Sequence, residues 1–570
     1  MKKAYFYGAY FKCDLQMKMI NIYCENTNMV RSYPLGITLN EIKEDMGIKL
    51  KYPILGAIVN HKVKELPFVV VKSKKIKFID YSHTDGRRLY IRSIMFLLHV
   101  SVRELYPHVK LKIPNGMSEG SYCELIGLGR KIAIEDLDAL KSNMLDWISR
   151  DIPFVKKGLP TSEAVEELIR QGMEDKARLL EQQGLLFAYL YYLNDYADFF
   201  YGHHVASTGY LTNFDLVPYL DGFLIRYPKP ENIDELEELC IYEKLFDVYK
   251  EHKNRAELLN LPNVSMLNDR IKKGEGSDII KVAEALHEKK IIEIANMVDK
   301  QRDEIKLILI SGPSSSGKTT SSKRLAVHLA VNGITPHIIS LDNYFVNREH
   351  TPLDENGNHD FEALEAVDTK FFNEQLNQLF QGEEVNLPRF DFMTGKREFP
   401  GTKLQLGIGH VLIVEGIHGM NPKLVPGIDE RWILRIFLSA LTQISLDDQN
   451  HISTTDNRLL RRMIRDSKYR GYPAVETIKR WASVRQGEEK NIFPYQENAD
   501  IMFNTALIYE LAVLRKYAEP LLKSVSEAEP EYCEANRLLK FLSYFSHLND
   551  KEIPPTSLLR EFLGGSSFKY

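Results

Sequence analysis

The sequence is poor in cysteine, in net charge and in long apolar runs. Its five cysteines in 570 residues never form CxxC spacing, which argues against a disulfide framework and a cysteine zinc site and favours a reducing cytoplasm. Lysine and arginine (74) nearly balance aspartate and glutamate (78), so the whole chain has no electrostatic footprint for nucleic acid. No uncharged apolar run approaches the roughly 18 residues that span a bilayer, and the opening residues lack the apolar core of a signal peptide. We therefore expect a cytoplasmic protein with no membrane partner.

The overall composition is ordinary for a globular protein, and the chain is long enough for several domains. Hydrophobic residues make up 44% and charged residues 27%, and the length predicts three or four units. Short β-like runs around the helical pattern LNEIKEDMG predict a small α+β domain over residues 19–80. Longer helical patterns mixed with strands predict a second module over residues 81–227, followed by a charged helical connector over residues 228–305.

A different pattern begins at residue 306. The apolar runs KLILIS, PHIIS, HVLIV, WILRIFL and ADIMFN alternate with helical stretches, as buried parallel strands do in a wound α/β sheet. We expect an α/β domain over residues 306–525. The remaining residues, 526–570, read as helices, with PPTSLLREFLGG predicted to form one apolar helix between prolines and glycines.

The first of these strands runs into a phosphate-binding motif. The segment satisfies GxxxxGK[ST] between a predicted strand and a predicted helix, which is the context that the motif requires. Its lysine would reach the β- and γ-phosphates of a nucleoside triphosphate, and its first threonine would bind Mg²⁺. The residues assigned to nucleotide binding are Gly312, Pro313, Ser314, Ser315, Ser316, Gly317, Lys318, Thr319 and Thr320.

Three carboxylates lie where ligands of a parallel sheet bind, beyond the strand ends. Asp342 follows PHIISL, Glu415 follows HVLIV, and Asp360 lies in the loop NGNHDFEA. Phosphoryl transfer to a hydroxyl needs one carboxylate to accept the alcohol proton and another to hold Mg²⁺. We assign these roles to Asp342 and Glu415. Helix capping is the alternative for either residue alone.

Arginines follow in DNRLLRRMIRDSKYRG. Arg458, Arg461, Arg462 and Arg465 are spaced i, i+3, i+4, i+7 and share one helix face, and Arg470 lies just beyond. Guanidiniums on one stripe repel each other unless an anion faces them. A solvated surface helix is the alternative, but we expect a closing lid that clamps the transferred phosphate.

Together, SGPSSSGKTT, SLDNYF, NHDFEALEAVD, PRFDF, VLIVEGIHG and DNRLLRRMIRDSKYRG resemble the uridine kinase branch of the phosphoribulokinase/uridine kinase family. The resemblance covers about residues 306–520 and implies a P-loop domain that phosphorylates uridine or cytidine with ATP and Mg²⁺. It implies that Asp342 is the base for the nucleoside 5′-hydroxyl and that Lys318 takes part in catalysis. The remaining implied contacts are Asp360 and Arg462 on the ribose, Arg465 and Arg470 on phosphates, and Phe345 and Phe390 on the substrate.

At two positions that the resemblance assigns to the nucleoside base, this sequence differs from the family motif. Phe390 replaces the tyrosine of the family motif, and Gly395 stands where a base-contacting histidine belongs. Losing a hydroxyl and an imidazole removes groups that discriminate between bases. We therefore expect a nucleoside kinase with altered or relaxed base choice.

The N-terminal half has resemblances of its own. INIYCENTNMVRSYPLGITLNEIKEDMG resembles a TGS domain, and RSIMFLLHVSVRELYPHVKLKI with GHHVASTGYLTNFDL resembles the second additional domain of threonyl-tRNA synthetases, the editing domain. That resemblance places Arg92, Phe96 and Phe200 where zinc-binding residues belong and retains only His204. One imidazole cannot supply the three or four ligands of a zinc site. We therefore expect His204 to be a core histidine and the module to be catalytically silent.

The sequence leaves two rival functions open. One is a kinase of another small alcohol in the same family, and the other is an RNA-associated regulatory NTPase. The N-terminal half would sense a small ligand, bind RNA or position the kinase domain. A homo-oligomer also stays open, and the sequence does not reveal the accepted base.

Overall fold

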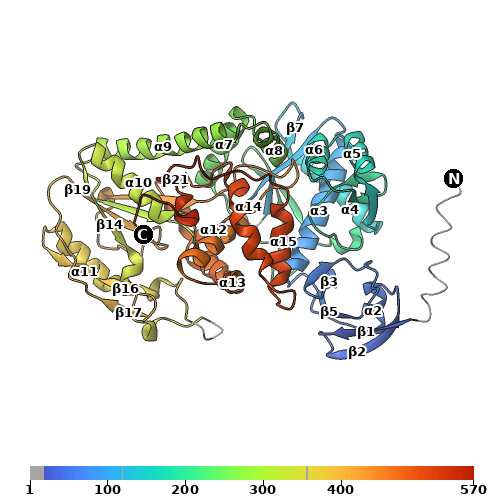
Figure 1. Ribbon diagram of the computed structural model, residues 1–570. Coiled ribbons are helices and arrows are strands. Elements are labelled where there is room, and N and C mark those ends of the chain that lie inside the picture. Colours follow the sequence, from blue (N-terminus) through green and yellow to red (C-terminus); the bar gives the residue numbers. More distant parts are fainter. Residues whose placement is uncertain (1–17, 118–119, 355–356, 358, 570) are drawn as a thin grey trace.

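The structure of the chain is a computed structural model that describes residues 18–117, 120–354, 357 and 359–569 (Figure 1). The N-terminal sheet has the strand order β2-β1-β5-β3-β4. Its strands are Met29–Pro34, Met19–Cys24, Lys74–Ile79, Gly56–Val59 and Lys62–Lys64. Helix α2 (Leu39–Asp45) packs on it and begins where the sequence predicts, because Thr38 and Glu41 form a reciprocal capping box.

The next module surrounds helix α3 (Thr84–Leu105), most of whose residues are buried. One sheet has the order β11-β12-β7-β6 and another the order β10-β9-β8. The strands are Asp215–Tyr219, Gly222–Arg226, Gly120–Ile126, Lys110–Met117, Tyr196–Asp198, Phe187–Leu193 and Val155–Pro160. The helices are α4 (Ile134–Ser149), α5 (Thr161–Arg170) and α6 (Glu174–Gln182). Helices α5 and α6 are separate because Gly172, at φ +77°, ends α5.

Helices bridge the two halves of the chain. They are α7 (Glu243–Leu258), α8 (Val264–Lys272) and α9 (Gly276–Lys300). Helix α9 runs along the top of the C-terminal half in Figure 1 and packs against α10 (Lys318–Val331).

The C-terminal half is built on a parallel sheet of order β14-β19-β13-β20-β21, in which all five predicted strands are confirmed. They are Thr335–Ser340, His410–Glu415, Leu307–Ser311, Ile433–Ser439 and Ile501–Asn504. Helix α11 (Thr369–Phe380) and two small hairpins lie beside it. The hairpins pair Val385–Asn386 (β15) with Lys403–Leu404 (β18) and Arg389–Asp391 (β16) with Lys396–Glu398 (β17).

Further helices pack around this sheet and return toward the N-terminal modules. They are α12 (Thr454–Tyr469), α13 (Ala474–Asn491), α14 (Glu510–Lys523), α15 (Tyr532–Leu542) and α16 (Arg560–Leu563). The apolar helix predicted within PPTSLLREFLGG is present but short, since only the four residues of α16 are helical. The Ser557 hydroxyl accepts the backbone N–H of Leu559, which draws the chain into turns before the helix starts.

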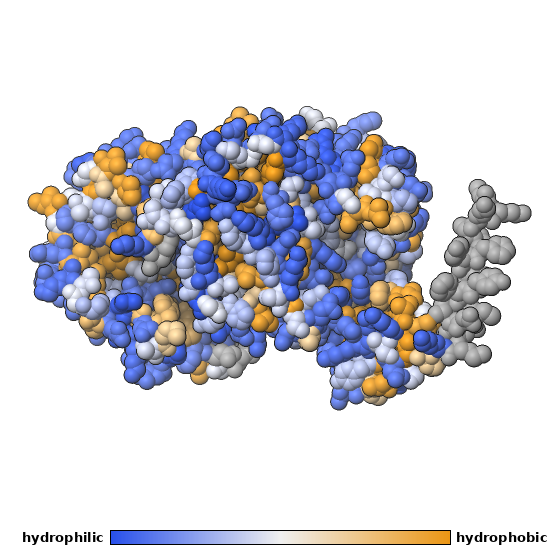
Figure 2. Space-filling model, viewed as in Figure 1, coloured by the Kyte–Doolittle hydropathy of each residue, from blue (hydrophilic) through white to orange (hydrophobic). Residues whose placement is uncertain are grey.

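Hydrophilic side chains dominate the face in Figure 2, and hydrophobic ones form small groups rather than one large patch. Within the described part of the chain, no helix has both the length and the apolar character needed to cross a bilayer.

Candidate active site

The phosphate-binding loop lies where the sequence predicts, between β13 and α10. Gly312 has φ +156° and Gly317 has φ +86°, backbone conformations that residues with a Cβ avoid. A Cβ on Gly312 would lie 2.2 Å from the Leu438 carbonyl oxygen. The loop can therefore close tightly around a phosphate only with glycine at this position.

The loop's polar groups fit a bound phosphate. The hydroxyls of Ser315 and Ser316 are buried and have no hydrogen-bond partner among the described residues, which is costly unless a ligand supplies one. Lys318 folds back on the loop and donates to the carbonyl oxygens of Gly312 (2.8 Å) and Pro313 (3.2 Å). The residues present thus suit a nucleoside triphosphate.

Carboxylates face this loop from two strand ends. The Thr319 hydroxyl lies 3.3 Å from Glu415 Oε1, so the two residues predicted to hold Mg²⁺ are together. Burial, and then the nearby Asp342, raise the pKa of Glu415 to about 7. Burial also raises the pKa of Asp342, against the opposing effect of Lys318, Arg470 and Arg465. Oxygen ligands beside a strained glycine loop fit a hydrated Mg²⁺ ion.

The arginine helix α12 was predicted to present four guanidiniums to an anion, and this prediction was wrong for two of them. Arg458 and Arg461 are only 1% and 0% exposed and form buried ion pairs with Glu488 and Glu510. They also donate to loop carbonyls, Arg458 to that of Ser314 and Arg461 to that of Ser315. A buried guanidinium needs such partners, and here the pairs hold the phosphate loop in place.

Three other arginines do line the cleft. Arg462 donates to the Ser314 hydroxyl (2.9 Å), while Arg462, Arg465 and Arg470 each lie 3.3 Å from a carboxylate oxygen of Asp466. One carboxylate neutralises only one of three cations, so the group keeps positive charge facing the loop. This arrangement suits an anionic phosphate.

Beyond Asp342 the cleft, about 690 Å³ in volume, becomes aromatic. Phe345 and Phe390 are buried, with ring centroids 5.6 Å apart, and Phe392 lies 5.2 Å from Phe390. Phe361 contacts Phe345 at 6.5 Å. Phe345 and Phe390, both predicted to bind substrate, therefore lie in one aromatic group at this end.

The loop that contains Asp360 presents a different carboxylate to the cleft. Asp360 Oδ1 accepts the backbone N–H of Glu362 (3.0 Å), and Glu362 lines the cleft. Burial, and then the negative charge of Glu488, raise the pKa of Glu362 to about 7. The assignment of Asp360 to the ribose stays a prediction, and Glu362 is a residue that sequence reasoning missed, although it lies two positions away in the same motif.

Sequence reasoning also missed Arg348 and Glu561. Arg348 packs against Gly395, where a Cβ would lie 2.8 Å from its side chain, and donates to the Phe392 carbonyl oxygen (2.6 Å). The Arg348 guanidinium thus occupies the space beside Gly395, the position at which the family resemblance implies a base-contacting histidine. Glu561 reaches the cleft from α16, and no local pattern around it signals that contact.

In the described part of the N-terminal module, His204 lies in a buried environment. The His204 side chain is fully buried and is ringed by aromatic side chains, those of Phe96, Phe154, Tyr191 and Phe200. Burial lowers its pKa well below the usual value. The interpretation of His204 as a core histidine agrees with this packing.

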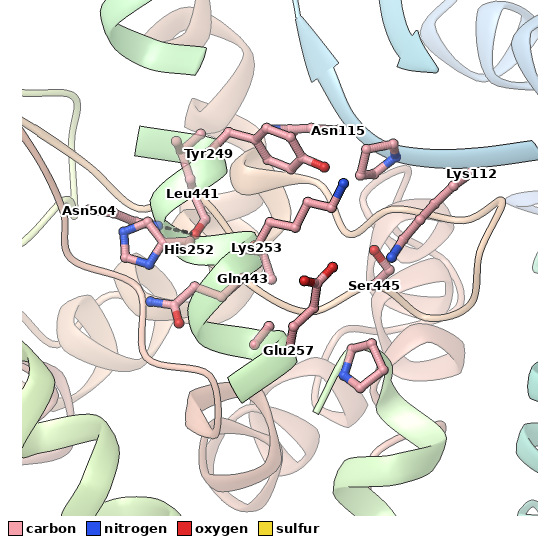
Figure 3. Close-up of a pocket in the computed structure, with 14 residues that line it drawn as sticks. Lys112, Asn115, Tyr249, His252, Lys253, Glu257, Leu441, Gln443, Ser445 and Asn504 are labelled. Atoms are coloured by element: carbon pink, nitrogen blue, oxygen red, sulfur yellow. Dashed lines mark hydrogen bonds between the residues drawn. The ribbon is translucent and has the colours of Figure 1, made fainter. Parts of the chain in front are cut away.

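A small cavity lies where the N-terminal module, the connector and the C-terminal half meet (Figure 3). It holds about 40 Å³, too little for a nucleotide. Lys112 comes from β6, Lys253 and Glu257 come from α7, and Asn504 donates to the Leu441 carbonyl oxygen (2.7 Å) at its edge. Charges of both signs line it, so it selects no ligand charge.

Residues 307–509 match the Phosphoribulokinase / Uridine kinase family. The matched residues include the phosphate loop and all five strands of the parallel sheet. Members of such a family in general use ATP and Mg²⁺. The acceptor is not specified by this match.

Solved structures and curated sequences add to the comparison. A possible uridine kinase from Bacillus stearothermophilus is 18% identical, with a TM-score of 0.25, over 35% of this chain and 89% of that one. D-glycerate 3-kinase from Cryptococcus neoformans is 13% identical, with a TM-score of 0.22, over 44% of this chain and 87% of that one.

The N-terminal part is similar to threonine–tRNA ligases. The ligase of Xanthomonas euvesicatoria is 26% identical over 35% of this chain and 31% of its own length. That of Syntrophomonas wolfei is 28% identical over 32% of this chain and 28% of its own. The chain thus spans about 30% of the length of such relatives.

Proposed function

We propose that the protein transfers the γ-phosphoryl group of ATP to the 5′-hydroxyl of a ribonucleoside. The observation that carries this proposal is the aromatic end of the cleft, formed by Phe345, Phe361, Phe390 and Phe392. It lies beyond Asp342 in the same cleft as the phosphate loop. Phenylalanine rings stack on planar bases, each stack contributing roughly 1–3 kcal/mol. A sugar phosphate or a small acid offers no such planar face, which favours a nucleoside over the other alcohols.

The chemistry follows from where the charged side chains lie. Asp342 takes the proton of the attacking hydroxyl as the new oxygen–phosphorus bond forms and the bond between the γ-phosphorus and its bridging oxygen breaks. A raised pKa makes the Asp342 carboxylate a stronger base. Arg465 and Arg470 face the charge that spreads over the transferred group, and Lys318 holds the β- and γ-phosphates. Thr319 and Glu415 would hold Mg²⁺, which neutralises phosphate charge when bound.

Base selection in this proposal is weak. Phe390 offers a ring face without a hydroxyl, and Arg348 offers only donors beside Gly395. Carbonyl oxygens and ring nitrogens of several bases accept such donors. We infer that uridine, cytidine and at least one purine nucleoside are accepted.

A panel of ribonucleosides tests the proposal directly. The full chain is incubated with ATP, Mg²⁺ and each nucleoside, and the 5′-monophosphate and ADP are quantified. We expect equal amounts of the two products with several bases. ADP release without any nucleoside monophosphate, or phosphorylation only of sugars or small acids, would overturn the proposal.

RNA binding by the N-terminal half is a second candidate function, favoured by one observation. Lys62, Lys64, Lys156 and Lys540 lie close enough that burial and their mutual repulsion lower the pKa of Lys64 and Lys540. Exposed aromatic rings accompany them, including Tyr189, over which Lys156 lies 5.0 Å from the centroid. Clustered lysines with exposed rings suit a nucleic-acid backbone and unstacked bases.

Salt dependence tests this second candidate. We expect fluorescent RNA to bind the full chain with an affinity that falls steeply as salt rises, and to bind a Lys64→Glu, Lys156→Glu double variant at least tenfold more weakly. A Lys281→Glu, Lys479→Glu variant, which changes lysines elsewhere, is the control. No saturable RNA binding at low salt would eliminate this function.

A further inference from the structure

The C-terminal segment, residues 553–569, lies directly on the phosphate loop. Leu558 packs against Gly317, since a Cβ there would lie 2.5 Å from the Leu558 side chain. The Arg461 guanidinium lies 5.3 Å from the centroid of the Phe562 ring. At the far end of the segment, the Lys323 ammonium donates to the Lys569 carbonyl oxygen. These contacts fix the segment over the first turns of α10.

One charged group of this segment enters the nucleotide site. Glu561 is 8% exposed and lines the cleft. Its Oε2 accepts a hydrogen bond from the Thr320 hydroxyl at 2.5 Å. Thr320 directly follows the phosphate-binding motif, whose backbone N–H groups cradle the α- and β-phosphates. A fixed carboxylate therefore lies at the end of the cradle where the nucleoside end of a triphosphate begins.

Two negative groups in one partly buried site repel each other strongly. A bound α-phosphate would be next to the Glu561 carboxylate and would compete with it for Thr320. Lys323 interacts electrostatically with Glu561 and offsets part of this repulsion.

Helix α15, which precedes this segment in the chain, contacts the N-terminal module. Glu534 accepts two hydrogen bonds from Arg88 of α3, at 2.8 and 3.2 Å. Arg537, which pairs with Glu534, also pairs with Asp456 in the first turn of α12 through two bonds of 2.7 Å. In Figure 1, α15 lies between α14 and the N-terminal elements. Helix α15 thus joins the N-terminal module to the arginine helix.

We propose that Glu561 is a nucleotide-site residue that competes with the α-phosphate for Thr320, so that the C-terminal segment lowers the affinity for ATP and loosens when ATP binds. This inference rests on the ATP site of the proposed function but not on its acceptor. Because ADP also carries an α-phosphate, the competition applies to both nucleotides.

Equilibrium binding to the full chain tests the competition. Glu561→Gln keeps the shape and an oxygen for Thr320 but removes the charge. We expect this variant to bind Mg-ATP and ADP each about five- to twentyfold more tightly than the unchanged protein, in titration calorimetry without nucleoside. Glu529→Gln, an exposed glutamate on the same C-terminal part, is the matched control and should leave both affinities unchanged. Unchanged or weaker nucleotide binding by Glu561→Gln would overturn the proposal, and tightening for ATP alone would overturn the α-phosphate assignment.

Hydrogen exchange on the unchanged protein gives a second test that needs no variant. Competition is reciprocal, so saturating ADP should speed amide exchange in residues 553–569 by at least threefold while slowing exchange in residues 312–320. Exchange that stays constant or slows in the C-terminal segment would contradict the proposal. Both experiments measure nucleotide binding, so a failure of nucleoside phosphorylation would be seen separately.

Discussion

The two halves of the chain use buried charge and buried aromatic rings in opposite ways. In the C-terminal half, Asp342, Glu415 and Glu362 line an open cleft, and burial raises the pKa of each. In the N-terminal half, His204 is enclosed by rings and kept neutral. In the first arrangement, burial makes the charged carboxylates unfavourable, and a bound ligand can reduce that cost. The second has exchanged polar groups for packing and has little left to react.

The difference lies in what surrounds the polar groups of each half. Phe96 and Phe200 contact each other with centroids 5.1 Å apart beside His204, which is a stable core contact. Resemblance to a ligase module therefore predicts shape in this half, whereas resemblance to a kinase predicts both shape and reactive groups in the other. Each substitution predicted below changes a residue in one of the two halves.

The largest effect should come from Asp342→Asn. Loss of the base should lower kcat by about 10³, within the usual range for general-base catalysis, while ATP affinity changes little. Steady-state kinetics with the best nucleoside and calorimetry with ATP measure the two quantities. Glu349→Gln, on the exposed part of the same loop, is the control. Normal turnover in Asp342→Asn would remove this residue as the base.

Next in size is His204→Ala in the N-terminal module. Removing a fully buried ring should lower the unfolding free energy by roughly 2–4 kcal/mol, measured by chemical denaturation with a probe in that module. Kinase turnover at 25 °C should not change. The exposed His108→Ala serves as control. A selective loss of turnover with unchanged stability would show that the enclosed site still takes part in the reaction.

Through Glu415, the free energy of unfolding should depend on pH by up to roughly 3 kcal/mol. The reason is that the pKa of Glu415 rises from 4.5 to about 7 on folding. Between these values the folded protein binds a proton that the unfolded chain has released, so stability falls as pH rises. Without nucleotide or metal, Glu415→Gln should remove part of this fall in denaturation curves between pH 5 and pH 8. The exposed Glu383→Gln should follow the unchanged protein. Identical pH curves for all three would contradict the raised pKa.

The smallest expected effect concerns Arg348. Arg348→Ala should raise the KM for the nucleoside about tenfold, equivalent to about 1.4 kcal/mol, with kcat nearly unchanged. The exposed Arg389→Ala is its control, and kinetics over several nucleosides measure the ratio between bases. If KM for every base is unchanged, Arg348 does not contact the acceptor.

Local patterns explain which parts of the fold could be predicted. The strands of the parallel sheet are short apolar runs, the phosphate loop is a contiguous motif, and the α2 capping box needs only Thr38 and Glu41. The arginine helix shows the limit of such patterns. Its spacing is correct, but Arg458 and Arg461 pair with Glu488 and Glu510 from other helices, and no spacing along α12 reveals partners that distant.

The sequence by itself determined the strands of the parallel sheet, the start of α2 and the strained glycines of the phosphate loop, because these depend on neighbouring residues. Only the tertiary structure decided that Glu561 meets Thr320, 241 positions earlier, that Arg348 occupies the space beside Gly395, and that Glu362 lines the cleft. Such contacts depend on how separate elements pack, and packing is governed by shape and charge across the whole chain rather than by any local repeat.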